Sequence, residues 1–221
     1  MIDNIIKVIT RYGNLFIEGI GVTLELAAIA VFFGAIVGAL LALLRMAKIK
    51  PLQWIAAIYI EFIRGTPILL QLYLFYFMLP NWLPALELSK KACIAIALIV
   101  NSSAYVSEIF RSGIQAVDRG QTEAARSLGL NGFQTMTRIV LPQAIKNILP
   151  SLCNEFIMIT KETSLASTFF IGDLMTQYKT ISGALYLVIE PLIIVGVIYF
   201  VMTFSLSKLV ALYERRLHKG D

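Results

Sequence analysis

Residues 17–44 read IEGIGVTLELAAIAVFFGAIVGALLALL, and this stretch indicates the class of the chain. Its only charged side chains are those of Glu18 and Glu25. A helix needs about 20 apolar residues to cross the ~30 Å hydrocarbon core of a bilayer, and this run exceeds that length. We therefore predict a transmembrane helix here and an integral membrane protein.

Four further apolar runs follow the first one along the chain. They span residues 51–79, 92–110, 148–170 and 184–209. Hydrophobic residues make up 58% of the sequence and charged residues 15%, which is far from the balance of a soluble domain. The runs are too long and too continuous for the alternating strands of a membrane barrel. We predict an all-α, polytopic membrane protein with five transmembrane helices in one domain, residues 1–221.

Basic residues between the runs predict the orientation of the chain. They gather after the first run, after the third run and in the C-terminal tail, and such segments face the cytoplasm. The N-terminus is therefore expected outside and the C-terminus inside, and the net charge of +5 does not indicate nucleic-acid binding. The basic residues of these three segments are Arg45, Lys48, Lys50, Arg111, Arg119, Arg126, Arg138, Lys146, Arg215, Arg216 and Lys219.

The polar loop at about 118–145 carries the most specific pattern of the sequence. Residues 123–128 favour a short helix that ends at Gly129, where glycine can adopt a positive φ. A second short helix is expected over 133–139, closed by Pro142. Both are too short and too polar to cross a membrane. We expect a compact docking surface on the cytoplasmic face.

The spacing within this loop resembles the signature of bacterial ABC importer permeases. The pattern is Glu-Ala-Ala, three residues, Gly, nine residues, Ile, any residue and Leu-Pro. The chain matches it at Glu123, Ala124, Ala125, Gly129, Ile139, Leu141 and Pro142. Further segments are similar to the polar amino-acid branch of that family, namely IRGTP at 63–67, NSSAY at 101–105, GIQAV at 113–117, PQA at 142–144 and NEFI at 154–157.

The resemblance implies a permease subunit of a type I ABC importer in the bacterial inner membrane. It implies a second identical or homologous permease subunit, two ATP-binding cassette ATPase subunits and an extracytoplasmic amino-acid-binding protein as partners. ATP and Mg would be bound by the ATPase, with no cofactor in this subunit. Coupling to the ATPase would fall to Glu123, Ala124, Ala125, Gly129, Leu141 and Pro142, with Gly129 turning a coupling helix into the ATPase cleft.

Polar groups inside the runs predict where cargo binds, because ionisable residues in a membrane tend to line cavities or find partners. Gly65-Thr66-Pro67 interrupts the second run, and Thr66 is suited to cap a half-helix whose N-terminus would attract a carboxylate. Asn101 lies midway along the third run. A simple proline kink is the alternative reading of the break.

The fourth run brings two carboxylates onto one helix face. Glu155, Met158 and Glu162 follow i, i+3, i+7 spacing. Carboxylates there would pair with a substrate ammonium group or with the head of arginine, lysine or histidine. We predict a substrate pocket formed by Thr66, Asn101, Glu155, Met158 and Glu162, for a polar and preferably basic amino acid.

Structural roles remain open for the same polar residues. Glu155 would alternatively bond a neighbouring helix, Asn101 would join helices, and Glu162 would pair with Lys161 or Arg64. The i, i+3 spacings of Glu61 with Arg64 and of Glu108 with Arg111 also predict ion pairs.

Other classes of protein are disfavoured by what the sequence lacks. It contains no phosphate-binding glycine loop followed by Lys-Ser/Thr, no Cys/His cluster for a metal, and no nucleophile and base together in a span. We therefore expect a non-catalytic subunit rather than an intramembrane enzyme or a purely structural subunit. The alternative function is an ion-coupled secondary amino-acid transporter with Glu155 and Glu162 as proton sites, which five runs without an internal repeat fit poorly.

Overall fold

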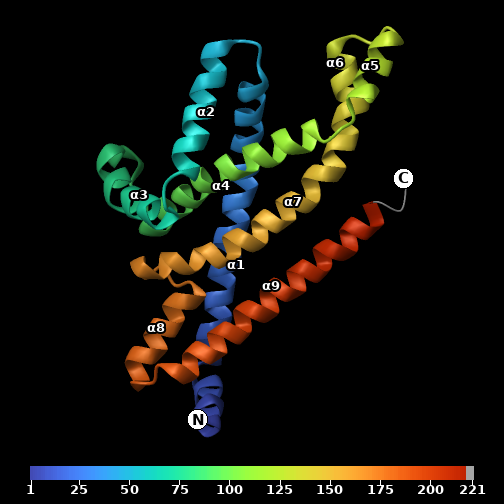
Figure 1. The fold of residues 1–221 in the computed structure, drawn as a ribbon. Coiled ribbons are helices and arrows are strands. Elements are labelled where there is room, and N and C mark those ends of the chain that lie inside the picture. Colours follow the sequence, from blue (N-terminus) through green and yellow to red (C-terminus); the bar gives the residue numbers. More distant parts are fainter. Residues whose placement is uncertain (218–221) are drawn as a thin grey trace.

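The computed structural model describes residues 1–217, and within them all regular structure is helical (Figure 1). The α-helices are α1 (Ile2–Met46), α2 (Lys50–Arg64), α3 (Ile68–Trp82), α4 (Lys90–Gln115), α5 (Arg119–Ser127), α6 (Gly132–Thr135), α7 (Leu141–Glu162), α8 (Leu174–Leu185) and α9 (Ile189–Leu217). Short helical segments of other types are η1 (Pro84–Leu86), η2 (Met136–Val140) and η3 (Thr163–Phe169). The predicted all-α class is confirmed. Lys219, one of the basic residues used to predict the orientation, lies outside the described residues.

Three single helices of the described chain are long and apolar enough to cross a membrane, namely α1, α4 and α9. With 45 residues, α1 extends for about 68 Å, roughly twice the thickness of the hydrocarbon core. The first and third predicted runs lie inside α1 and α4. The fifth run was predicted to start at residue 184, which is wrong: α8 ends there, and Tyr186 takes a left-handed φ of 54° before α9 begins.

The second predicted run is divided between α2 and α3, which meet at an angle of 103°. The two helices are long and apolar enough to cross a membrane only when they are taken together, either as one broken span or as a re-entrant loop. The restart of a helix after Gly65-Thr66-Pro67 is confirmed, but the capping role predicted for Thr66 is wrong. Pro67 is the N-cap of α3, and the Thr66 hydroxyl donates back to the carbonyls of Phe62 (3.0 Å) and Ile63 (3.3 Å).

The fourth predicted run, 148–170, differs from the structure at both ends. Helix α7 begins earlier, at Leu141, and ends at Glu162, where the backbone tightens into the 3₁₀ segment η3 and then turns at Phe170 with φ 52°. Polar residues lower the mean hydropathy of α7, so α7 is not among the helices that are long and apolar enough to cross a membrane. The described chain thus has three such helices, or four with the bent pair, and the predicted count of five is not confirmed.

The polar loop folds as two short helices, as predicted, but Pro142 does not close the second one. After α6 the backbone widens into the π-helix η2 and continues directly into α7, whose first turn contains Pro142. Proline is tolerated in a first turn because its missing N–H has no partner to lose there. The run from Gly132 to Glu162 is therefore uninterrupted helix of changing type.

Small residues on α1 allow α4 to pack closely against it. A Cβ atom added to Gly34 would lie 3.0 Å from the Ser102 side chain, and one added to Gly38 would lie 2.8 Å from the Ser103 carbonyl oxygen. Close backbone approach at small residues is typical of helix pairs in membranes. Toward the other end of the same helix pair, residues 26–30 of α1 and 94–98 of α4 form a hydrophobic core with α3, α7 and η3.

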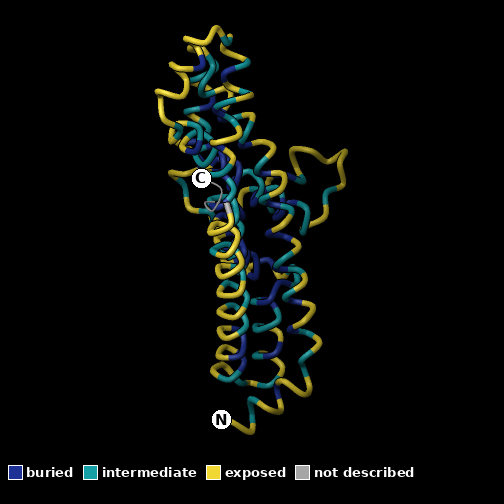
Figure 2. Tube along the Cα trace, turned by 90° about the vertical axis from the view of Figure 1, so that its right-hand side faces the viewer, coloured by how far each residue is buried: buried dark blue, intermediate teal, exposed yellow. Residues whose placement is uncertain are grey.

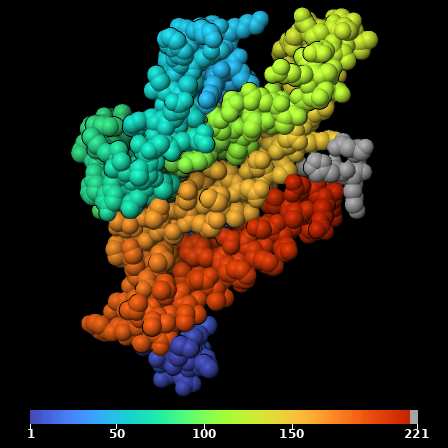
Figure 3. All heavy atoms as spheres, viewed as in Figure 1, coloured from blue at the N-terminus to red at the C-terminus, as the bar shows by residue number. Residues whose placement is uncertain are grey.

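In the view of Figure 1, α1 crosses α4, α7 and α9, which run in similar directions. Helix α9 lies beside α7 (Figure 3), and its residues are mostly exposed along the helix (Figure 2). The α5–α6 pair projects at the end of the molecule opposite the N-terminus (Figure 1). Exposed apolar helix surface of this kind is what a lipid-facing helix requires.

Candidate functional site

A buried amide network connects the α2–α3 break to the middle of α4. The Gln71 side chain on α3 donates hydrogen bonds to the Ile63 carbonyl oxygen (2.8 Å) and the Thr66 hydroxyl (2.9 Å). Asn101 on α4 then donates to the Gln71 side-chain oxygen at 3.0 Å. Gln71 thus adds a shorter bond to a carbonyl oxygen at the end of α2, which also accepts from Thr66, and it connects the break to α4.

One atom of this network is left without a partner. Asn101 is 3% exposed, and its Oδ1 accepts no hydrogen bond from the described residues. A buried amide oxygen without a donor costs about 1–3 kcal/mol. Such an atom is a candidate acceptor for a ligand that brings an N–H group.

The next residue of α4 connects the network to α7. Ser102 is fully buried and donates to Glu155 Oε1 at 3.1 Å. Asn101 and Ser102 therefore face α3 and α7 respectively. Of the predicted pocket residues, Asn101 lies on this stretch of α4, Glu155 bonds it directly, and Thr66 is connected to it through Gln71.

The remaining two predicted pocket residues lie farther along α7. Met158 is 48% exposed, and Glu162, the last residue of α7, is half-buried. The helix face that carries Glu155, Met158 and Glu162 is thus buried at Glu155 and exposed at Met158. The structure joins neither Met158 nor Glu162 to the amide network by a hydrogen bond among the described residues.

Gln71 is a central residue that sequence reasoning missed. It is the only polar, non-aromatic side chain between Ile68 and Leu79, within an otherwise apolar run. An isolated amide in such a run is costly unless it finds a partner, so its presence was a usable signal. Ser102 gave no comparable signal, because serine is common at helix contacts in membranes.

A second candidate surface is the α5–α6 pair. Asp118 caps α5 by accepting from the Gly120 N–H at 2.7 Å, and Asn131 and Gln134 form a capping box at the start of α6. Gly129, with φ +85°, makes the turn between the two helices. Backbone bonds from Gly129 to Arg126 and from Leu130 to Ala125 complete a Schellman motif.

Two large apolar side chains project from this turn. Leu128 is 84% exposed and Phe133 is 77% exposed, although both belong to a polar segment. Of the predicted coupling residues, Ala125 is buried, Glu123, Ala124, Gly129 and Pro142 are exposed, and Leu141 is half-buried. Exposed large apolar groups on a polar loop mark an interaction surface.

A cavity of about 800 Å³ lies beside the α5–α6 pair, and its lining is partly basic. Lys48 of the α1–α2 loop lines it together with Arg119 and Arg126 of α5. Thr122 and Thr135 add hydroxyl groups to its lining. The cavity therefore lies between the polar loop and the α1–α2 connection.

Comparisons with known proteins match nearly the whole chain. Residues 23–219 match the family described as binding-protein-dependent transport system inner membrane component. The arginine transport system permease protein ArtQ of Bacillus subtilis (strain 168) is 40% identical, over 93% of each chain. A putative glutamine transport system permease protein of Rickettsia bellii (strain RML369-C) is 41% identical, over 91% of this chain and 92% of its own length.

Solved structures show the same arrangement of helices. A chain in the crystal structure of an amino acid ABC transporter with histidines is 48% identical, with a TM-score of 0.88 over 94% of this chain and 96% of that one. An inward-facing methionine ABC transporter, MetNI, superposes with a TM-score of 0.78 over 93% of this chain and 97% of that one. Its identity of 19% supports the fold alone.

Proposed function

Because this chain belongs to the family of binding-protein-dependent transport system inner membrane components, we propose that it forms the membrane path of an ATP-driven importer of polar amino acids. Its partners would be two ATPase subunits, a second permease subunit and an extracytoplasmic binding protein. Its N-terminus would lie outside the inner membrane and its C-terminus in the cytoplasm.

The observation that carries the ATP-coupled reading is the exposed turn of the α5–α6 pair. Leu128 and Phe133 flank Gly129 in the α5–α6 pair, which lies at the end of the molecule opposite the N-terminus (Figure 1). They offer an apolar contact that a cytoplasmic ATPase would bury. Since α6 continues through η2 into α7 without a loop, movement of that contact would displace α7.

The proposed cargo site lies where α3, α4 and α7 meet. A substrate ammonium group would donate to Asn101 Oδ1, which has no donor from the described residues, and to the Glu155 carboxylate. Met158 and Glu162 would extend the site along α7, where the side chain of arginine, lysine or histidine would find the second carboxylate. The names of the arginine and glutamine relatives agree with a polar amino acid as cargo.

Transport in proteoliposomes tests the proposal. The complex, with its ATPase and binding protein, is expected to take up amino acid only when ATP is supplied. Uptake driven by a proton gradient without nucleotide would instead establish the ion-coupled alternative.

Two carboxylate variants separate the cargo site from general effects of charge. Glu155→Gln is expected to lower the affinity for a basic amino acid at least tenfold, because it removes a buried, charge-assisted acceptor. Glu25→Gln is the matched control, since Glu25 pairs with Lys91 (2.7 Å) on the partly exposed surface of α1 and α4. Equal affinities in both variants, with the complex folded, would remove Glu155 from the site.

A further inference from the structure

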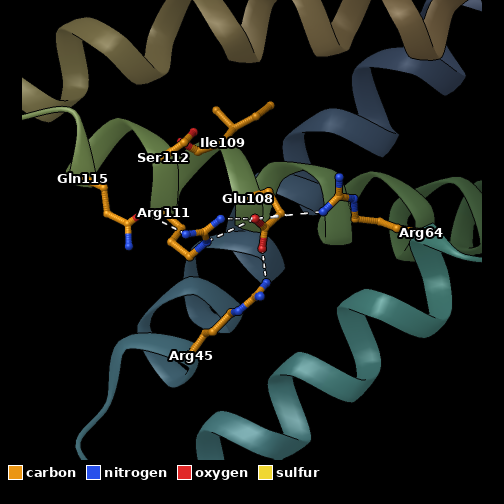
Figure 4. Close-up of polar contacts among 7 residues, drawn as sticks. All are labelled: Arg45, Arg64, Glu108, Ile109, Arg111, Ser112 and Gln115. Atoms are coloured by element: carbon orange, nitrogen blue, oxygen red, sulfur yellow. Dashed lines mark hydrogen bonds and ion pairs between the residues drawn. The ribbon is translucent and has the colours of Figure 1, made fainter.

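Three arginines from separate parts of the sequence surround one carboxylate (Figure 4). Glu108 on α4 accepts from Arg111 on the same helix, at 2.6 Å from Nη2 and 3.1 Å from Nε. Arg45, near the end of α1, forms an ion pair with the other carboxylate oxygen. Arg64, the last residue of α2, approaches Glu108 at 4.0 Å. We call these four residues the arginine cluster.

The arginine cluster has more positive charge than its carboxylate neutralises. No other carboxylate of the described residues lies within ion-pair distance of these three guanidinium groups. Arg64 makes no close hydrogen bond to Glu108, and its guanidinium instead stacks on the Tyr105 ring, 5.5 Å from the centroid. Its side chain is 45% exposed, so its donors are available to a second anion.

The depth of the arginine cluster indicates which anion can reach it. Glu108 lies about 27 Å from Lys90 along α4, close to the full thickness of the hydrocarbon core. Arg45 likewise directly follows the apolar part of α1. With the C-terminal ends of α1 and α4 on the cytoplasmic side, Arg45 and Glu108 lie toward the inner leaflet, and the side chain of Arg64 reaches Glu108 from the end of α2.

Exposed apolar side chains lie next to the cluster in the sequence. Leu43 and Leu44 precede Arg45 on α1, and Phe62 precedes Arg64 on α2, all exposed. Apolar neighbours do not stabilise a free inorganic anion. A lipid bound at the arginines would pack its acyl chains against the exposed apolar surface of α1 and α2, of which these side chains are part.

We propose that Arg45, Arg64 and Arg111 bind the phosphate of an anionic lipid headgroup in the inner leaflet. Guanidinium groups match phosphate oxygens with paired hydrogen bonds, and basic pockets between helices on the cytoplasmic side suit such headgroups. Glu108 orients the three guanidinium groups and competes with the lipid for their charge. The proposal requires the cytoplasmic placement of the α1 and α4 ends, but not any particular cargo.

Lipid binding to the purified complex tests the proposal without measuring transport. In nanodiscs of phosphatidylcholine, added phosphatidylglycerol is expected to be retained in native mass spectra and to raise the unfolding temperature. Arg64→Gln is expected to weaken phosphatidylglycerol binding about fivefold, the effect of one basic residue near a membrane surface. The matched control is Arg11→Gln, which removes an exposed arginine near the other end of α1 and is expected to change binding little.

Glu108→Gln separates a lipid site from a purely structural ion-pair cluster. Removing the competing carboxylate is expected to strengthen phosphatidylglycerol binding by the folded complex. If Arg64→Gln and Arg11→Gln have equal effects, or if Glu108→Gln only destabilises the complex without a gain in binding, the lipid site is refuted. If inorganic phosphate in phosphatidylcholine nanodiscs stabilises the complex as much as phosphatidylglycerol does, the phosphate site remains but its occupant is not a lipid.

Discussion

Gly129 has a backbone conformation that other residues adopt only with strain. Its φ is +85°, and a Cβ added there would meet no atom within 4 Å. The cost of Gly129→Ala is therefore conformational and about 1–2 kcal/mol. We expect this variant to weaken ATPase binding by about tenfold in a titration with the purified permease, because the turn that presents Leu128 and Phe133 is less populated.

Gly183→Ala is the matched control for that titration. Gly183 lies in α8, also has open space around its Cβ position, and has no positive φ. ATPase binding should be unchanged in this variant. Equal losses in both variants would show that the conformation of Gly129 is not what the ATPase requires.

The side chain of Gln71 connects the α2–α3 break to α4 by hydrogen bonds. Gln71→Leu leaves the Asn101 amide without its acceptor, and the Ile63 carbonyl oxygen keeps only its bonds from Thr66. A buried amide left without its acceptor costs about 1–3 kcal/mol, so the free energy of unfolding should fall by about that amount. Denaturation in detergent micelles measures the loss. Asn81→Leu on the same helix is the control, since Asn81 is exposed and bonds only its own helix at Phe77, and a comparable loss there would contradict this role for Gln71.

Ion pairs show which residue contacts a sequence can predict. The i, i+3 pair of Glu108 with Arg111 was predicted and is present, because helix geometry alone brings these residues together. The same spacing predicted a pair of Glu61 with Arg64, which is wrong: Arg64 approaches Glu108 on another helix. That choice depends on how α2 lies against α4, which spacing along one helix does not contain.

Among the helices, the contact of α1 with α4 depends on glycine. A Cβ at Gly38 would lie 2.8 Å from the Ser103 carbonyl oxygen and 2.9 Å from Val106 Cβ, neither of which can rotate away. Gly38→Ala should therefore force the helices apart and lower the free energy of unfolding by about 1–3 kcal/mol, despite the higher helix propensity of alanine.

Gly21→Ala on the same helix supplies the control for that measurement. A Cβ at Gly21 meets nothing within 4 Å, so alanine should be neutral or stabilising by up to about 1 kcal/mol. Thermal unfolding of both variants in the same detergent compares them. A destabilised Gly21→Ala, or a stabilised Gly38→Ala, would show that close packing of α1 on α4 does not limit stability.

The helices themselves were predictable where apolar length alone determines them. Helices α1 and α4 follow from their apolar runs, and the break before Pro67 follows from the lost N–H of proline. The change from α7 into η3, and the separate helix α8, were not predicted. Residues 163–170 contain no glycine or proline that would mark a helix end, and the 3₁₀ segment packs on α1 and α3, which lie far away in the sequence.

At the scale of the whole molecule, α4 connects the candidate sites. Its residues Asn101 and Ser102 meet α3 and α7, and Glu108 binds the arginines of the cluster about two turns farther along. The run from α6 through α7 joins the exposed turn to Glu155 with no loop between them. The predicted cargo site remains a prediction, although Gln71 connects Thr66 to Asn101 and Ser102 bonds Glu155. The bridging role of Gln71 requires the 103° bend, whose size the sequence does not predict.

The bend between α2 and α3 leaves two topologies for the described chain. If the pair crosses the membrane once, Lys48 and Ala85 lie on opposite sides; if it is re-entrant, they lie on the same side. The positive-inside rule places Lys48 in the cytoplasm. A single crossing then puts Ala85 outside and, through α4, Gln121 inside, where the ATPase is expected.

Labelling with an impermeant maleimide distinguishes these topologies. Single cysteines are introduced into a variant that lacks Cys93 and Cys153, at exposed positions of the described chain. We expect Lys7→Cys, Ala85→Cys and Val188→Cys to be labelled in intact spheroplasts, and Lys48→Cys and Gln121→Cys only after permeabilisation. Labelling of Gln121→Cys from outside would exclude a cytoplasmic coupling surface. Ala85→Cys protected together with Lys48→Cys would mean that α2 and α3 enter and leave on one side, and that α1, α4, α7 and α9 alone cross the membrane.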